Sequence, residues 1–282
     1  MADAAQDYFI VITRPDAQAA PWAEQLQALG FNCARVNLLD IVAVSDAEKI
    51  RAIKNRILDV DLYQKIIFVS QNAVDFGMAW LEDYWPQMPI GIDFFAVGAT
   101  TAKKLASYGV AVQDLAASTG GGMTSEDLLS AEHLQQVDGE KVLIFRGCGG
   151  RGHLADELRK RGAKVDYCEL YERVLPAAAQ AQLLQLIADT EASSAQRLVS
   201  LHSGESLQNL LAVLAQFAPP EQQRVQAWMN NSVFLVPSAR IVAAAQAAGF
   251  KRVICAENAT DKAMTAALLE YCRTQECILL QD

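Results

Sequence analysis

The segment FIVITRP (9–15) has a counterpart in KVLIFRG (141–147), which lies 132 residues further along the chain. At the same offset, Leu26 aligns with Leu158 and Gly30 with Gly162. Three later pairs of segments keep this order, namely those around Ser70 and Ser203, around Gly98 and Pro237, and from Thr124 and Thr260 onward. This period is too long for a solenoid. It therefore predicts two similar domains with a ligand cleft between them.

Composition narrows the class of protein. The 282 residues are 52% hydrophobic and 20% charged, as in ordinary globular proteins, and the net charge of −9 argues against a nucleic-acid partner. The six cysteines and three histidines lack metal-ligand spacing, so we expect reduced thiols, no metal and no cofactor. We see neither a signal peptide nor an apolar run of about 18 residues. We expect a cytoplasmic monomer without a membrane partner.

Short apolar strands alternate with amphipathic helices along both halves. This alternation predicts an α/β fold in which each of two similar lobes has a parallel sheet flanked by helices. The elements expected in the first half are strands at 8–13, 65–70 and 94–97, helices at 16–30, 46–58 and 99–107, helices from Asn72 and Thr124, and an extended run from Cys33 to Val44. The second half repeats the pattern from Lys141.

The chain contains no flexible linker between the halves. We therefore expect the equivalent extended segments 32–44 and 164–176 to carry the chain between the lobes, as a two-stranded β hinge near 36–42 and 170–176. Residues 1–37 with 173–282 then form one discontinuous domain, and 39–171 form the other. The competing layout is a simple division near residue 137.

The run RGCGGRG (146–152) follows a strand and opens a helix. Its Gly147, Gly149 and Gly152 match the dinucleotide fingerprint G-x-G-x-x-G, but the acidic residue expected about 20 positions later does not end the next strand. An anion-binding turn at a helix N-terminus is the favoured interpretation. Arg146 and Arg151 border this turn, and Arg14 is the counterpart of Arg146. We interpret all three as carboxylate or phosphate ligands, against the alternative that they are surface arginines.

Hydroxyl and small residues stand at the strand-to-helix junctions of both halves. Simple helix N-capping is the alternative for each of them, but their repetition favours a surface of donors for a flexible polyanion. The candidate substrate-binding residues at these junctions are Thr13, Ser70, Asn72, Gly98, Thr100, Thr101, Ser125, Ser203, Ser238 and Thr260. Thr124 and Asp127 have capping-box spacing. The glycines at 120–122 before them are typical of a mobile surface loop, and the functional alternative is a lid that closes over a ligand.

Tyr171, in CELYERV, occupies the position where the first half has Leu39. Tyrosine hydroxyls are protonated at neutral pH. A tyrosine that replaces an aliphatic residue at the cleft is therefore a candidate proton donor. Packing against the hinge is the alternative role.

Several of these segments together resemble the uroporphyrinogen-III synthase family. The resemblance covers about residues 10–270, and it depends on order and spacing more than on any one motif. The segments that carry it are VITRP (11–15), FVSQNAV (68–74), FAVGATTAKKL (95–105), TSEDLL (124–129), the RG…GR…RGA run (146–163), ELYERV (169–174), VPSARIVAAAQAAGF (236–250) and ENATDKAM (257–264).

The resemblance implies a two-lobed enzyme with a discontinuous first domain and no cofactor. It implies cyclisation of hydroxymethylbilane, a linear tetrapyrrole polycarboxylate, with loss of water and inversion of ring D through a spiro intermediate. The family's tyrosine falls on Tyr171 and its threonine pair on Thr100 and Thr101, whereas the second half has Ser238–Ala239 at that junction. The alternatives are a non-catalytic bilobed protein that binds an anionic small molecule and a dinucleotide-dependent enzyme.

Overall fold

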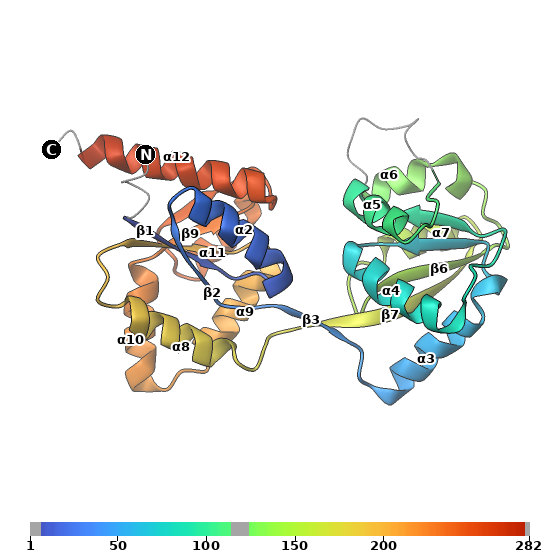
Figure 1. The fold of residues 1–282 in the computed structure, drawn as a ribbon, viewed down its shortest axis with the longest axis horizontal. Coiled ribbons are helices and arrows are strands. Elements are labelled where there is room, and N and C mark those ends of the chain that lie inside the picture. Colours follow the sequence, from blue (N-terminus) through green and yellow to red (C-terminus); the bar gives the residue numbers. More distant parts are fainter. Residues whose placement is uncertain (1–6, 114–123, 280–282) are drawn as a thin grey trace. The chain divides into compact units, whose positions relative to one another are not determined.

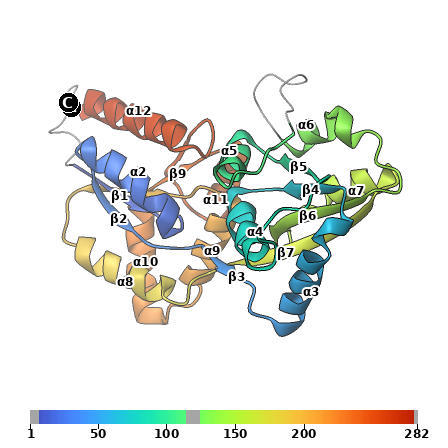
Figure 2. The same ribbon diagram turned by 45° about the vertical axis from the view of Figure 1, so that its right-hand side comes forward.

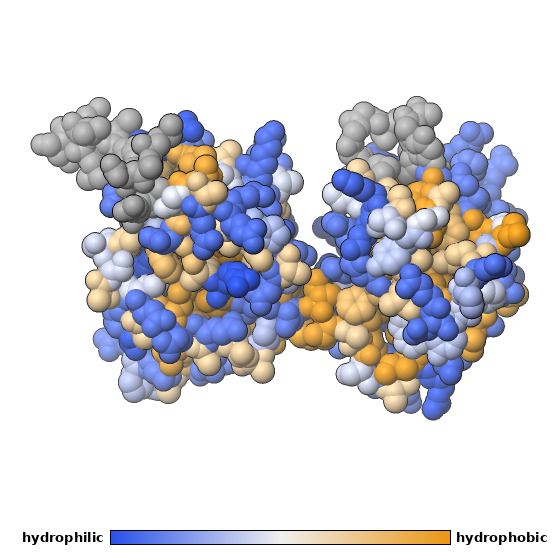
Figure 3. Space-filling view, viewed as in Figure 1, coloured by the Kyte–Doolittle hydropathy of each residue, from blue (hydrophilic) through white to orange (hydrophobic). Residues whose placement is uncertain are grey.

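The computed structural model describes residues 7–113 and 124–279, with the side chains described as far as residue 275. The chain divides into two compact units (Figure 1). Unit 1 comprises Met1–Asp40 and Val174–Asp282, and unit 2 comprises Ile41–Arg173. No helix in the described ranges is long and apolar enough to cross a membrane. Hydrophilic side chains cover much of the visible face of each unit (Figure 3).

Unit 1 contains one parallel sheet with the strand order β10-β9-β8-β1-β2. The strands are β1 (Tyr8–Ile12), β2 (Asn32–Arg35), β8 (Gln196–Ser200), β9 (Val233–Val236) and β10 (Val253–Cys255). The helices are α2 (Asp16–Ala28), α8 (Ala179–Thr190), α9 (Gly204–Leu214), α10 (Pro219–Asn230), α11 (Ala239–Ala247) and α12 (Asp261–Leu279). Alternate residues of the strands pack on opposite faces of the sheet.

Helices cover both faces of the unit 1 sheet. On one face, Ile10 and Ile12 pack with α2 and α12, and on the other, Val11 packs with α8, α9, α10 and α11. Figures 1 and 2 show α2 and α12 on one side of the strands and α8 and α10 on the other. Burial on both faces explains why these strands are apolar runs without polar alternation.

Unit 2 contains a second sheet with the order β3-β7-β6-β4-β5, in which β7, β6, β4 and β5 are parallel. The strands are β3 (Asp40–Ala43), β4 (Lys65–Phe68), β5 (Asp93–Ala96), β6 (Lys141–Gly147) and β7 (Lys164–Val174). The helices are α3 (Ala47–Leu58), α4 (Gln71–Tyr84), α5 (Ala99–Ser107), α6 (Ser125–Ser130), α7 (His153–Lys160), η1 (Val60–Leu62) and η2 (Glu132–Leu134). Helices α3, α4 and α5 cover one face, and α6 and α7 cover the other.

The two sheets repeat one arrangement. The duplicated segments place β1 with β6, β2 with β7, β8 with β4 and β9 with β5, and these strands occur in the same order in both sheets. The predicted fold class, two parallel α/β sheets flanked by helices, is confirmed. Both boundaries between the units fall in the neighbouring strands β3 and β7.

Candidate functional site

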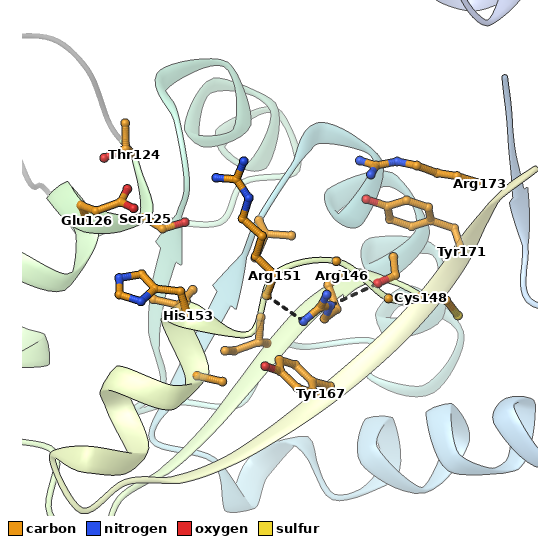
Figure 4. A pocket seen from close by; sticks show the side chains of 17 residues that line it. Thr124, Ser125, Glu126, Arg146, Cys148, Arg151, His153, Tyr167, Tyr171 and Arg173 are labelled. Atoms are coloured by element: carbon orange, nitrogen blue, oxygen red, sulfur yellow. Dashed lines mark hydrogen bonds between the residues drawn. The ribbon is translucent and has the colours of Figure 1, made fainter. Parts of the chain in front are cut away.

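A pocket of about 370 Å³ opens at the carboxyl end of the unit 2 sheet (Figure 4). Its wall consists of the end of β6 and the loop after it, the first turns of α6 and α7, and three side chains of β7. Carboxyl ends of parallel strands are where α/β proteins commonly bind ligands. Six predicted site residues line this pocket: Ser125, Arg146, Gly147, Gly149, Arg151 and Tyr171.

The glycine loop between β6 and α7 favours an anion in this pocket. Gly149 and Gly150 have φ angles of 71° and 89°, in the left-handed region that glycine adopts without strain. Gly152 caps α7 without a side-chain hydrogen bond. Because the first N–H groups of a helix have no partner inside the helix, those of α7 remain available to a ligand.

Charged side chains surround the same opening. Arg151 and His153 project toward the pocket in Figure 4, and Arg173 lies beside Tyr171. Among the residues that the structure describes, Glu126 is the one acidic side chain of the lining. Its pKa is lowered by hydrogen bonds from its own backbone and from Thr124, and further by the charges of His153 and Arg151. The pocket is thus a positively charged region on a protein whose net charge is negative.

Tyr171 lines the pocket although it is only 2% exposed. Its hydroxyl lies 2.9 Å from the Oγ atom of Ser70, and its ring stacks on Phe76 at a centroid distance of 5.4 Å. Gly147 is its neighbour on the paired strand β6. A Cβ atom at Gly147 would stand 2.5 Å from the Cε2 atom of Tyr171, so only glycine leaves room for the ring.

Ser70 has two roles here, since its Oγ atom also accepts a hydrogen bond from the backbone N–H of Ala73 at the start of α4. We expect Ser70→Ala to lower activity by about 2- to 13-fold, which corresponds to the net contribution of a typical hydrogen bond. Steady-state kinetics measure this change. Ser203→Ala removes the equivalent cap of α9 in unit 1 and should likewise lower activity only modestly. A loss beyond about a thousandfold would instead make Ser70 a participant in the chemistry.

Five other predicted residues of unit 2 are not part of the pocket lining: Ser70, which contacts the pocket residue Tyr171, and Asn72, Gly98, Thr100 and Thr101. Gly98 caps α5 with a φ angle of 91°, and Thr101 in the first turn of that helix is buried. Asn72 belongs to the first turn of α4. The capping box predicted at Thr124 and Asp127 is confirmed. The loop predicted at 120–122, the candidate lid, lies outside the described residues.

Five predicted residues belong to unit 1, at the corresponding ends of its strands and starts of its helices. Thr13 donates a hydrogen bond to the backbone oxygen of Ser200, and Arg14 forms an ion pair with Asp261. Ser203 caps α9, and Ser238 stands at the start of α11 without a side-chain cap bond. Thr260 accepts a hydrogen bond from the backbone N–H of Ala263 near the start of α12.

His202 lies beside this edge of unit 1, with its ring edge-on to Trp22 at a centroid distance of 5.0 Å. Among the described residues, neither ring nitrogen of His202 has a hydrogen-bond partner. Burial, reinforced by the positive charge of Arg14, lowers the pKa of His202 from 6.5 to about 3. The folded protein therefore resists protonation of His202, whereas the unfolded chain binds the proton readily.

A lowered pKa in the folded state means that this stability is complete above about pH 6.5 and is lost as the pH falls toward 3. Between pH 7 and pH 5, we expect His202 to remove about 2 kcal/mol from the free energy of unfolding. Urea unfolding of the wild type and of His202→Leu at both pH values measures this difference. His133→Leu, at an exposed position, is the control. An equal loss in His202→Leu and in the wild type would contradict the account.

The lining also contains side chains that the sequence reasoning missed, among them His153, Tyr167 and Arg173. His153 is the first residue of α7, immediately after the glycine run, so its place at the helix start was visible in the sequence. Tyr167 and Arg173 lie on β7 on either side of Tyr171. Within the described ranges, no cluster of three or more His, Cys, Asp or Glu side chains is arranged to hold a metal ion.

The fold and the pocket define a duplicated two-unit α/β protein with a site suited to an anion. Its sequence is similar to two enterobacterial proteins over nearly their whole length. It is 29% identical over 265 residues to the uroporphyrinogen-III synthase of Escherichia coli K12, and 30% identical over 262 residues to that of Salmonella typhimurium LT2. Each match covers 92% of this chain and 99% of the relative.

Solved structures show the same fold at low identity. A mutant uroporphyrinogen III synthase from the extremely thermophilic bacterium Thermus thermophilus aligns with a TM-score of 0.55 at 15% identity, covering 95% of this chain and 99% of that chain. The uroporphyrinogen-III synthetase of Helicobacter pylori 26695 aligns with a TM-score of 0.56 at 14% identity, covering 94% and 99%. The family model described as uroporphyrinogen-III synthase HemD matches residues 20–266. This chain belongs to the uroporphyrinogen-III synthase family.

Proposed function

We propose that this chain is a cyclising lyase that converts hydroxymethylbilane into uroporphyrinogen III, with loss of water and inversion of ring D. The family supplies the reaction, since its curated relatives carry that enzyme name. The observation that carries the proposal in this chain is the hydroxyl of Tyr171 at the wall of an anion-suited pocket.

The pocket explains how a protein of net charge −9 binds a polycarboxylate. Backbone N–H groups at the start of α7 and the positive end of the helix dipole favour carboxylates without adding net charge. Arg151 at the mouth adds a charged donor. We assign these groups to one or more of the substrate's carboxylate arms.

The hydrogen bond between Ser70 and Tyr171 is compatible with proton donation. The Oγ atom of Ser70 already accepts from the Ala73 N–H, which leaves the Ser70 proton free to be donated to the Tyr171 oxygen. The phenol proton then faces the substrate, where it is delivered to the departing hydroxyl as the C–O bond breaks and water leaves. The same hydrogen bond from Ser70 stabilises the phenolate that forms.

After water leaves, the substrate is an electrophilic azafulvene, and ring closure must take place at the substituted carbon of ring D. Fixing the carboxylate arms restricts the conformations of the linear tetrapyrrole. Such restraint favours the reactive geometry without a further catalytic group.

The test is to incubate the purified protein with enzymatically generated hydroxymethylbilane and to separate the product isomers. We expect the inverted isomer III to dominate. Reactions without protein and with heat-denatured protein are the controls, because hydroxymethylbilane closes spontaneously to the non-inverted isomer. Isomer distributions equal to those controls would contradict the proposal, and binding of hydroxymethylbilane without turnover would indicate the non-catalytic binding protein instead.

A further inference from the structure

Arg146 lies at the carboxyl end of β6 and is only 8% exposed, although it borders the pocket. Its Nε atom donates to the backbone oxygen of Gly147 at 3.1 Å, and its Nη1 atom donates to the backbone oxygen of Arg151 at 3.3 Å. These two carbonyls bracket the glycine loop. The guanidinium is therefore engaged inside the loop, and Figure 4 shows both hydrogen bonds.

The two hydrogen bonds determine which way the loop peptides face. A trans peptide directs its C=O and its N–H in opposite directions. Because Arg146 binds the carbonyl of Arg151, the N–H of Gly152 in the same peptide is directed away from the guanidinium. This N–H belongs to the N-cap residue of α7. Arg146 thus helps to orient the peptide N–H groups at the start of α7.

The loop fits closely around this guanidinium. A Cβ atom at Gly150 would stand 2.6 Å from the Nη2 atom of Arg146, so a side chain at that position would displace one or the other. The N–H of Gly149 donates to the Oε1 atom of Glu169 at 3.1 Å, and the same oxygen lies 3.8 Å from the Nε atom of Arg146. One carboxylate therefore contacts both the loop and the arginine that organises it.

Tyr167 supports the guanidinium from below in Figure 4. The Cζ atom of Arg146 lies 4.5 Å from the centroid of the Tyr167 ring, which is within the range of a cation–π interaction. The backbone of Tyr167 pairs with that of Ile144 on β6, two residues before Arg146, so the sheet fixes the position of the ring. The ring therefore offers a rigid surface for a planar guanidinium to stack on.

We propose that Arg146 and Tyr167 are positioning residues, which hold the loop at 147–152 in the conformation that receives a substrate carboxylate. The inference rests on the proposed function and deepens it. Arg146 acts through the backbone of the loop and not as a direct ligand of the substrate. Tyr167 acts through Arg146. Both residues set the affinity for substrate, and neither takes part in the proton transfer assigned to Tyr171.

A set of substitutions distinguishes the positioning of the loop from proton transfer. Lysine carries one ammonium group and cannot bond two carbonyls as the guanidinium fork does. We therefore expect Arg146→Lys and Tyr167→Leu each to raise KM by about 5- to 30-fold, with kcat changed by less than about threefold. Tyr167→Phe keeps the stacking ring and should restore most of the affinity. Lys160→Ala, which removes an exposed charge from α7, is the control.

A second measurement needs no substrate. The amide protons of Cys148 and Gly149 are bonded to the backbone oxygen of Tyr171 and to Glu169, and this pairing depends on the loop conformation. Hydrogen exchange of these amides should accelerate in Tyr167→Leu and Arg146→Lys by about 5- to 30-fold, and remain close to the wild type in Tyr167→Phe. The fold is checked by circular dichroism.

The outcomes are distinct. Wild-type KM in Arg146→Lys would show that a point charge suffices and would overturn the positioning role. Unchanged exchange and unchanged KM in Tyr167→Leu would overturn the role of the ring. If the wild type produced no isomer III, the proposed function would fail, and the exchange measurement alone would decide whether Arg146 and Tyr167 hold the loop.

Discussion

Tyr171→Phe should slow formation of the inverted isomer by about 10²- to 10⁴-fold, the usual contribution of a general acid. The substitution keeps the ring that stacks on Phe76 and fits over Gly147, so the packing of unit 2 should be preserved. It removes only the hydroxyl that contacts Ser70. The effect should therefore appear in kcat and leave KM nearly unchanged. Some activity should remain, because water or a substrate carboxyl group can donate the proton.

The measurement is the rate of isomer III alone, because spontaneous closure supplies the other isomer. The matched control is Tyr63→Phe, which removes a buried hydroxyl of the same unit that bonds Asp166 outside the pocket. Wild-type rates of isomer III from a folded Tyr171→Phe protein would make Tyr171 a packing residue and leave conformational restraint as the whole mechanism.

Gly147→Ala should reduce the rate of isomer III by at least about a hundredfold, although it adds only one methyl group. The new Cβ atom would stand 2.5 and 2.8 Å from two atoms of the Tyr171 ring, closer than Cβ atoms approach other heavy atoms, and 3.0 Å from a third. The ring must therefore move away from β6, and its hydroxyl moves with it. Displacement of a reacting group by about 1 Å costs on the order of 10²-fold in rate.

A double-mutant cycle identifies the cause of this loss. If Gly147→Ala acts by displacing the hydroxyl of Tyr171, it should add little to the defect of Tyr171→Phe, so the two effects should not be additive. Thermal unfolding of each variant checks that the protein remains folded. Near-wild-type activity in Gly147→Ala, or full additivity of the two changes, would contradict the placement of Tyr171.

The repeat and the local signals were sufficient for much of the fold. The helix predicted at 99–107 is α5, and the strand predicted at 8–13 is β1, one residue shorter. These segments combine an apolar strand with an abrupt helix start, so the local pattern determines them. The strands formed by the extended run after Cys33 were harder to predict. It forms two strands, β2 and β3, which belong to different sheets. Which sheet accepts each strand depends on partners distant in sequence.

The candidate site was harder to predict than the fold. Ser70, Thr101 and Arg146 all lie at or shortly after the carboxyl end of a strand, so their sequence positions gave no reason to rank one above another. Whether a junction borders a pocket depends on which helices pack beside it. The packing of α6 and α7 leaves a pocket open at the end of β6. The inward direction of Arg146 depends on the conformation of the glycine loop around it. Helix-capping and strand patterns carry no information on either point.

The central claim is that the pocket of unit 2 receives the carboxylates of the tetrapyrrole. The most direct measurement is an amide NMR titration of the ¹⁵N-labelled protein with the product uroporphyrinogen III under reducing, anaerobic conditions. We expect saturable shifts at the amides of Gly150, Arg151, Gly152 and His153, at the start of α7, and weaker shifts in Arg146→Lys. Saturable binding that leaves these four amides unchanged would contradict the claim.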